Sequence, residues 1–257
     1  MKVLILAAGY AVRLGELTHD TPKPLLSINN KKIIDRILDK ISAVKGIGSI
    51  YVVTNNKFFE KFSDWRLESP YNKKITLIND GSNSNETRLG AIRDLEMAIE
   101  EMAIEEDLLV VAGDNLFDFD LNDFLKFAGT NRGAVCVALY DIKDLNAAKR
   151  FGVIKLDGHN RIIDFAEKPE IPKSTLVSTG VYYFPKNKLI LIKKYVTMQD
   201  KKLDAPGYCI SWLAAADAVY GFTFLKDWYD IGDIESFERA NREYRKKESD
   251  NRKDPAR

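Results

Sequence analysis

Candidate phosphate-binding residues follow a short apolar run at the start of the chain. Small residues and an arginine stand together in Leu6-Ala7-Ala8-Gly9-Tyr10-Ala11-Val12-Arg13-Leu14, and Lys23 lies between two prolines in Pro22-Lys23-Pro24. Small side chains let backbone N–H groups approach a triphosphate, and Arg13 and Lys23 would add cationic contacts. A plain tight turn is the alternative, but the two cations favour phosphate binding. The loop contains neither a G-x-G-x-x-G fingerprint nor a P-loop.

The composition excludes several classes of partner. The chain of 257 residues is 45% apolar and 30% charged, which is typical of a folded globular protein. Its net charge of +1 gives no electrostatic reason to expect a nucleic-acid or membrane partner. The apolar start is too short for a signal peptide, and no stretch approaches the roughly 20 apolar residues of a membrane span. Cys136 and Cys209 lack metal-ligand spacing, so we expect buried free thiols in a reducing, cytoplasmic compartment.

The first half of the chain alternates short apolar runs with helical patterns. The predicted strands are Val3–Ala8, Ile50–Thr54, Ile75–Ile78 and Leu108–Ala112. Apolar residues at helical spacing predict helices over Ile33–Val44 and Leu89–Ile99. Such a βαβαβ succession implies a mostly parallel sheet with helices on both faces, a Rossmann-like α/β fold of three layers.

The second half has shorter connections, which favours a mixed or antiparallel extension of the sheet. Its predicted strands are Ala134–Tyr140, Val153–Leu156, Arg161–Glu167 and Val177–Phe184, and its predicted helices are Leu189–Val196, Ile210–Ala216 and Ile234–Tyr244. Asp233 is well placed to cap the last helix. We expect one domain over residues 1–245, with halves 1–130 and 131–245, and a charged, frayed tail over 246–257.

A series of short motifs continues along nearly the whole chain. They are Leu6–Leu14, Pro22–Leu26, Ala112–Phe117, Arg150–Val153, Glu167–Pro169, Ser178–Tyr182 and Trp228–Gly232. In this order they resemble the sugar-phosphate nucleotidyltransferases, especially the glucose-1-phosphate thymidylyltransferases. The resemblance implies a single nucleotidyltransferase domain whose first half binds the nucleotide and whose second half binds the sugar phosphate.

The resemblance also implies a reaction and the residues that carry it. A sugar 1-phosphate would attack the α-phosphate of a nucleoside triphosphate in line and release pyrophosphate, with Mg²⁺ held by Asp114 and Asp230. The implied catalytic residues are Arg13, Lys23, Asp114 and Lys168, with Arg13 on the leaving pyrophosphate and Lys23 between the reacting phosphates. The implied nucleotide contacts are Leu6, Ala8, Gly9, Tyr10, Ala11, Arg13, Lys23, Arg88, Gly90 and Asp114.

The sugar phosphate would contact a separate set of residues in the second half. These are Gly152, Glu167, Lys168, Thr179 and Gly180. Pro169 should hold Lys168 in an extended backbone conformation. Structural alternatives are a surface ion pair between Glu167 and Lys168 and an Asx-turn at Asp114. Asp118 and Asp120 form an Asp-x-Asp pattern, but we expect a solvated loop that enters a helix there.

Two segments depart from the thymidylyltransferase pattern. Ala11 replaces a glycine, which we expect phosphate binding to survive. Residues 83–90 replace a Gly-rich base-reading segment, and the Arg88-Leu89 pair is similar to an element of glucose-1-phosphate cytidylyltransferases. dTTP and CTP are therefore the favoured nucleotides, with the base left open. Lys201–Trp212, on the acceptor side, also differs, so the identity of the sugar is open.

Three other functions stay open at this point. One is a cytidylyltransferase for a non-sugar phosphate such as phosphocholine, although the Glu167-Lys168-Pro169 match favours a sugar. Another is a catalytically silent nucleotide-binding homologue, which would not need both Asp114 and Asp230. A glycosyltransferase of similar fold would consume a sugar nucleotide without pyrophosphate exchange. By analogy alone, we also expect a homo-oligomer.

Overall fold

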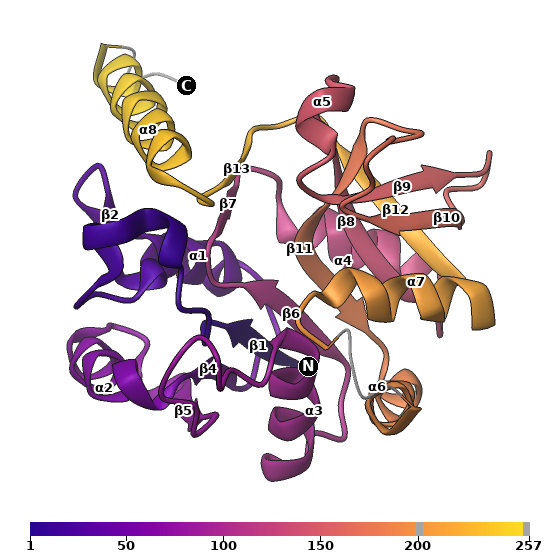
Figure 1. Cartoon of the computed structure of the whole chain (residues 1–257), viewed down its shortest axis with the longest axis horizontal. Coiled ribbons are helices and arrows are strands. Elements are labelled where there is room, and N and C mark those ends of the chain that lie inside the picture. Colours follow the sequence, from indigo (N-terminus) through magenta and orange to yellow (C-terminus); the bar gives the residue numbers. More distant parts are fainter. Residues whose placement is uncertain (199–202, 254–257) are drawn as a thin grey trace.

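A nine-stranded sheet lies at the centre of the computed structural model, which describes residues 1–198 and 203–253 (Figure 1). Its strands are β1 (Lys2–Leu6), β4 (Ile50–Thr54), β5 (Ile75–Asn79), β6 (Leu108–Ala112), β8 (Val135–Asp141), β9 (Gly152–Leu156), β10 (Ile162–Glu167), β11 (Leu176–Phe184) and β12 (Val219–Phe224). The order along the sheet is β10-β9-β11-β6-β1-β4-β5, and β8 pairs with β11 and β12.

The strands of the first half are parallel, and most of those in the second half are antiparallel. β1 pairs in parallel with β4 and β6, and β4 does so with β5. β11 runs antiparallel to β6, β8 and β9, and β10 runs antiparallel to β9. This arrangement confirms the predicted α/β fold, with a parallel centre and an antiparallel extension.

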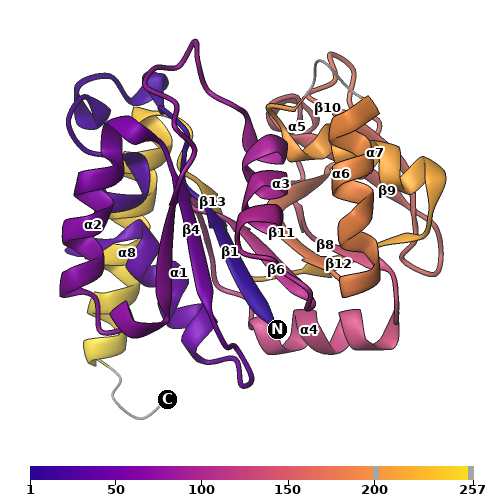
Figure 2. The same cartoon turned by 90° about the horizontal axis from the view of Figure 1, so that it is seen from below.

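Helices cover both faces of the sheet and make the three predicted layers (Figure 2). They are α1 (Ile33–Ser42), α2 (Phe59–Glu68), α3 (Ala91–Glu101), α4 (Leu121–Thr130), α5 (Leu145–Ala148), α6 (Leu189–Met198), α7 (Pro206–Ala216) and α8 (Ile234–Lys253). Side chains alternate along β1, so Val3 and Ile5 join a core with α1, α2 and α4, while Leu4 joins one with α3, α6 and α7. Burial on both faces explains the continuous apolar run of this strand.

Two very short strands lie beyond the end of β6 and were not predicted. β7 (Asn115–Phe117) and β13 (Trp228–Asp230) pair antiparallel and set Asn115 opposite Asp230. The Ile231 N–H also donates to the Asp114 carbonyl at 3.2 Å. The pair therefore joins the turn after β6 to a distant part of the chain. A third, smaller sheet consists of β2 (Ser27–Ile28) and β3 (Lys31–Lys32).

Helix α8 is longer than the sequence indicates. Asp233 caps it as predicted, because its carboxylate accepts a hydrogen bond from Ser236 N at 2.9 Å. The helix then continues past Tyr244 to Lys253, through most of the expected frayed tail, whose residues 254–257 lie outside the described residues. Lys247 explains part of the difference, since it forms ion pairs with Asp118 and, at 2.7 Å, with Asp227.

Other local predictions are confirmed. Asp120 caps α4 by accepting a hydrogen bond from Asn122 N at 2.8 Å, as expected for a loop entering a helix. Cys136 and Cys209 are buried free thiols, and burial raises the pKa of each to about 12. In the part of the chain that the structure describes, no helix is both long enough and apolar enough to cross a membrane.

Candidate active site

Lys23, from a 3₁₀ turn at Lys23–Leu25, meets Asp114 just beyond the carboxyl end of β6. Lys23 Nζ donates to Asp114 Oδ2 at 2.7 Å, and the lysine side chain is only 10% exposed. Burial alone would raise the pKa of Asp114, but the Lys23 charge and hydrogen bonds from Lys23 and Asn115 lower it. Asp114 is therefore held as a carboxylate.

Asp114 is oriented by two further side chains. Asn115 Nδ2 donates to Asp114 Oδ1 at 2.8 Å, and Trp228 Nε1 donates to Asn115 Oδ1 at 2.8 Å. Side chains from β7 and β13 thus hold the carboxylate in place. This arrangement favours a functional role over the alternative of a simple Asx-turn.

Asp230 lies beside Asp114 because β13 pairs with β7. Burial and the Asp114 charge raise the pKa of Asp230 to about 6, and Lys23, Arg13 and Arg150 offset this only in part. None of the residues that the structure describes donates a hydrogen bond to the Asp230 carboxylate. Two adjacent carboxylates, one of them without a hydrogen-bond donor among the described residues, fit Mg²⁺, which prefers oxygen ligands.

The loop between β1 and a 3₁₀ turn at Val12–Thr18 is fixed from both sides. Ala8 O accepts a hydrogen bond from Asn55 Nδ2 at 2.9 Å, and Tyr10 Oη lies 3.1 Å from Ser82 Oγ. Over residues 8–11, no backbone N–H donates to an oxygen of the described residues. Successive unpaired N–H groups in a fixed loop can bind phosphate oxygens. Ala11 has a φ of 49°, in the left-handed region that favours glycine.

A cavity of about 280 Å³ adjoins both carboxylates. Arg13, Asp114 and Asn115 line it from the first half of the chain. Asn115 is the residue opposite Asp230 in the β7–β13 pair. Every residue predicted for the sugar phosphate also lines it: Gly152, Glu167, Lys168, Thr179 and Gly180. The fold therefore brings the predicted sugar-phosphate residues to one cavity with Asp230 and two of the predicted nucleotide contacts, Arg13 and Asp114. Lys23 and the residues of the Gly9 loop do not line it.

Glu167 is wedged between the start of α7 and β9. A Cβ on Gly207 would lie 1.9 Å from Glu167 Oε2, and one on Gly152 would lie 3.1 Å from it. Burial raises the pKa of Glu167, and the Lys168 charge opposes the rise. Lys168 Nζ is 3.9 Å from Glu167 Oε1 and largely exposed, so the lysine is available to a ligand.

The prediction of an extended backbone at Lys168 is wrong. Its φ is 46°, and its N–H donates to Phe151 O at 3.0 Å. This hydrogen bond closes the pairing of β10 with β9, so the chain must turn at Lys168 before Pro169. Backbone strain of this kind costs about 1–3 kcal/mol and is common at ligand sites.

Thr179 and Gly180 contact neighbouring strands of the sheet and so support the wall of the cavity. Thr179 Oγ1 donates to Ala138 O at 2.9 Å inside the protein, so its hydroxyl hydrogen is not available to a sugar. Gly180 has a φ of 76°, and a Cβ there would lie 2.7 Å from Ala112 Cβ. A side chain at Gly180 would displace the end of β6, just before Asp114.

The structure separates Arg88 and Gly90 from the cavity and adds Arg150 to it. Arg88 forms an ion pair with Asp204, at 2.9 Å from Nε to Oδ1, and Gly90 packs against the backbone of Asp204. Arg150 lines the cavity and donates to Asp233 Oδ2 at 3.0 Å. The Arg150–Val153 motif contained this arginine, but no role was predicted for it. Asp204 was missed because it lies in the segment that departs from the pattern.

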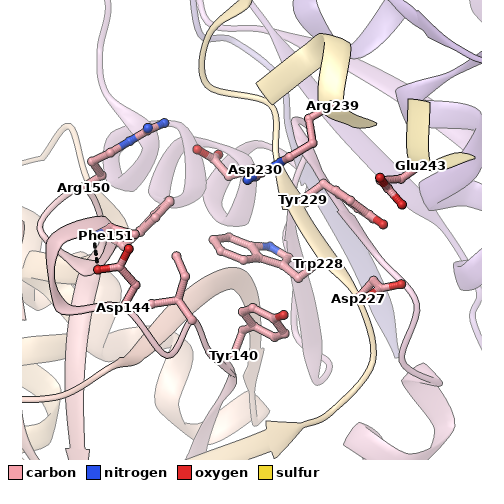
Figure 3. A pocket seen from close by; sticks show the side chains of 12 residues that line it. Tyr140, Asp144, Arg150, Phe151, Asp227, Trp228, Tyr229, Asp230, Arg239 and Glu243 are labelled. Atoms are coloured by element: carbon pink, nitrogen blue, oxygen red, sulfur yellow. Dashed lines mark hydrogen bonds between the residues drawn. The ribbon is translucent and has the colours of Figure 1, made fainter. Parts of the chain in front are cut away.

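A larger cavity of about 490 Å³ shares Arg150, Phe151, Trp228 and Asp230 with the first (Figure 3). Figure 3 shows the Trp228 indole between Tyr140 and Asp230. The ring centroid of Trp228 lies 5.7 Å from that of Tyr140 and 5.1 Å from that of Phe151. These aromatic contacts fix the indole that orients Asn115.

The fold and this site define an α/β protein with paired carboxylates and cations at the carboxyl ends of its parallel strands. Residues 2–247 match the model of the nucleotidyl transferase family, and the chain belongs to that family. The prediction of an enzyme of the nucleotidyltransferase type is therefore confirmed.

Solved structures confirm the fold. One is a candidate glucose-1-phosphate thymidylyltransferase from Bacillus anthracis in complex with sucrose, with a TM-score of 0.81, 23% identity and 94% of each chain covered. Another is apo UDP-glucose pyrophosphorylase, with a TM-score of 0.81, 19% identity and coverage of 96% of this chain and 98% of the other. A third is UDP-glucose pyrophosphorylase complexed with UDP-glucose, with a TM-score of 0.81, 20% identity and coverage of 96% of this chain and 98% of the other.

Proposed function

We propose that the protein couples a nucleoside triphosphate to a sugar 1-phosphate, giving a nucleotide sugar and pyrophosphate. The observation that carries the proposal is the Lys23–Asp114–Asp230 group, whose two carboxylates line the same cavity as Glu167 and Lys168. The similar fold of a pyrophosphorylase complexed with UDP-glucose supports a nucleotide sugar as product. dTTP and CTP are the favoured nucleotides, and the free thiols suit a reducing cytoplasm.

The first half would bind the triphosphate. The unpaired N–H groups of residues 8–11 donate hydrogen bonds to its oxygens, and Arg13 neutralises the pyrophosphate that leaves. Lys23 keeps Asp114 ionised and supplies positive charge at the α-phosphate. Asp114 and Asp230 would hold Mg²⁺, which when bound neutralises charge that builds up on the α-phosphate.

The second half would position the acceptor. Lys168 contacts its phosphate and Glu167 its hydroxyl groups, both from the same cavity wall. A phosphate oxygen of the acceptor forms a bond to the α-phosphorus as the bond to the pyrophosphate oxygen breaks. Because both reactants are anions, these residues act by positioning and charge neutralisation. No side chain forms a covalent intermediate.

A pyrophosphate-release assay tests the proposal. Purified protein with Mg²⁺ is incubated with dTTP, CTP, UTP, ATP or GTP, each paired with a panel of sugar 1-phosphates and with phosphocholine. We expect release with one sugar 1-phosphate and with dTTP or CTP. Release of pyrophosphate with phosphocholine alone would show that the acceptor is a non-sugar phosphate and not a sugar 1-phosphate. Silence across the panel, from protein shown to be folded, would contradict the proposed reaction.

A further inference from the structure

Arg88 ties the loop over residues 83–90 to the loop over residues 203–207. Its Nε and Nη2 donate to the two carboxylate oxygens of Asp204, at 2.9 and 3.2 Å. Its Nη1 donates to Asn85 O at 2.6 Å. Three of its five N–H donors are thus used within the protein, in the two-pronged geometry that makes arginine–carboxylate pairs strong.

The backbone reinforces this connection. Ile92 N donates to Leu203 O at 2.9 Å and Ala91 N donates to Asp204 O at 3.3 Å. These N–H groups belong to the first turn of α3, where a helix leaves its donors unpaired. Gly90 allows the contact, since its φ is 91° and a Cβ would lie 2.7 Å from Leu203 O.

Each end of the connection reaches one of the two proposed binding sites. At one end, Tyr10 Oη in the Gly9 loop lies 3.1 Å from Ser82 Oγ, just before residues 83–90. At the other end, Asp204, Ala205, Pro206 and Gly207 line the acceptor cavity. Hydrogen bonding to Arg88 lowers the pKa of Asp204, so the ion pair between them, here called the bridge, stays charged.

We propose that Arg88 is a positioning residue that couples the nucleotide loop to the acceptor loop, and that it does not read the base. The inference rests on the proposed function, because it names the two substrates whose binding is coupled. Nucleotide binding at the Gly9 loop fixes residues 83–90, and the bridge then fixes Asp204–Gly207. Nucleotide binding therefore raises the affinity for the acceptor, and acceptor binding raises the affinity for the nucleotide by the same factor.

A double-mutant cycle separates this role from base recognition. We expect Arg88→Ala to raise the KM of the acceptor about tenfold, equivalent to about 1.4 kcal/mol, with the Kd of the nucleotide alone within about twofold of wild type. Adding Asp204→Ala to Arg88→Ala should raise the acceptor KM little further, because the two side chains form one interaction. Arg93→Ala, which removes an exposed arginine of α3 paired with Glu96, is the matched control. A large loss of nucleotide affinity, additive losses or no change in KM would overturn the proposal.

Amide hydrogen exchange tests the coupling between the two loops without requiring turnover. We expect saturating CTP or dTTP to slow exchange over residues 203–213 in wild type and in Arg93→Ala, and to leave it unchanged in Arg88→Ala. Equal protection in Arg88→Ala, or none in wild type, would refute the coupling. Failure of the proposed reaction would appear separately, as absence of pyrophosphate release from the wild-type enzyme.

Discussion

The Trp228 indole N–H donates a hydrogen bond to the Asn115 side chain at 2.8 Å, across 113 positions of sequence. Asn115 in turn donates to Asp114, so an aromatic residue of the cavity wall fixes a carboxylate of the same cavity through an asparagine. Trp228→Phe keeps the ring and loses the donor. We expect turnover to fall about tenfold or more, since groups that orient metal ligands contribute about 10–100-fold. Steady-state kinetics measure the change.

The matched control for that variant is Trp65→Phe. It removes an indole hydrogen bond of the same length, 2.8 Å to Asp35, between α2 and α1. Turnover like wild type is expected there. Equal losses in the two variants would show that the Trp228 effect is general destabilisation.

Lys23 and Asp114 should be needed for turnover and not for folding. Lys23→Ala and Asp114→Asn each remove one side of the 2.7 Å pair. We expect turnover to fall by about 10²–10³ or more, as when a group that stabilises transition-state charge is lost. Circular dichroism should show a folded protein. Lys31→Ala, from an exposed pair with Asp39, is the control, and near-wild-type turnover in Lys23→Ala would exclude that residue from the mechanism.

Gly207→Ala should weaken acceptor binding. The added Cβ would lie 1.9 Å from Glu167 Oε2, so the carboxylate must leave its position in the cavity wall. We expect the acceptor KM to rise about tenfold, as a loss of about 1.4 kcal/mol would produce, with nucleotide binding unchanged. Gly129→Ala, in α4 with nothing within 4 Å of the added atom, is the control. An unchanged KM would mean that Glu167 does not contact the acceptor.

Ala11→Gly should stabilise the protein. Ala11 has a φ of 49°, a conformation that costs residues with a Cβ about 1–2 kcal/mol and costs glycine little. We expect the free energy of unfolding to rise by about 1 kcal/mol or less, because glycine also loses more entropy on folding. Urea denaturation measures the difference. A decrease would show that the Ala11 methyl group makes contacts worth more than the strain.

Asp94 should make stability fall with rising pH. Burial, with the charges of Asp80 and Asp204, raises its pKa to about 8, whereas an unfolded aspartate has a pKa of about 3.9. Between these values the folded chain binds the extra proton, so this contribution is complete at low pH and is lost as pH rises to about 8. Asp94→Asn should flatten the fall in unfolding free energy between about pH 5 and 8. Parallel curves for the two proteins would contradict the raised pKa.

Local features of this protein could be predicted from the sequence. Asp233 and Asp120 cap helices that begin within three residues of them, so their roles depend on neighbouring amides. The apolar run of β1 and the helical spacing of α1 indicate burial directly. The cations Arg13 and Lys23 follow one strand closely, and strand ends of a parallel sheet are where ligands bind.

Features that depend on distant contacts could not be predicted. β7 and β13 have three residues each and no periodicity, and only their pairing makes them strands. Lys247, which supports the far end of α8, has its partners at Asp118 and Asp227. Arg88 looked like a base reader because Asp204, 116 positions away, could not be recognised as its partner.

The pairing of β7 with β13 also bears on when the protein becomes active during its synthesis. Lys23 and Asp114 leave the ribosome well before Trp228–Asp230, which adds the second carboxylate and the indole donor. A nascent chain that ends before Trp228 therefore lacks the second carboxylate of the pair. If the proposed function is right, we therefore expect nucleotide chemistry only from chains in which β13 has paired with β7.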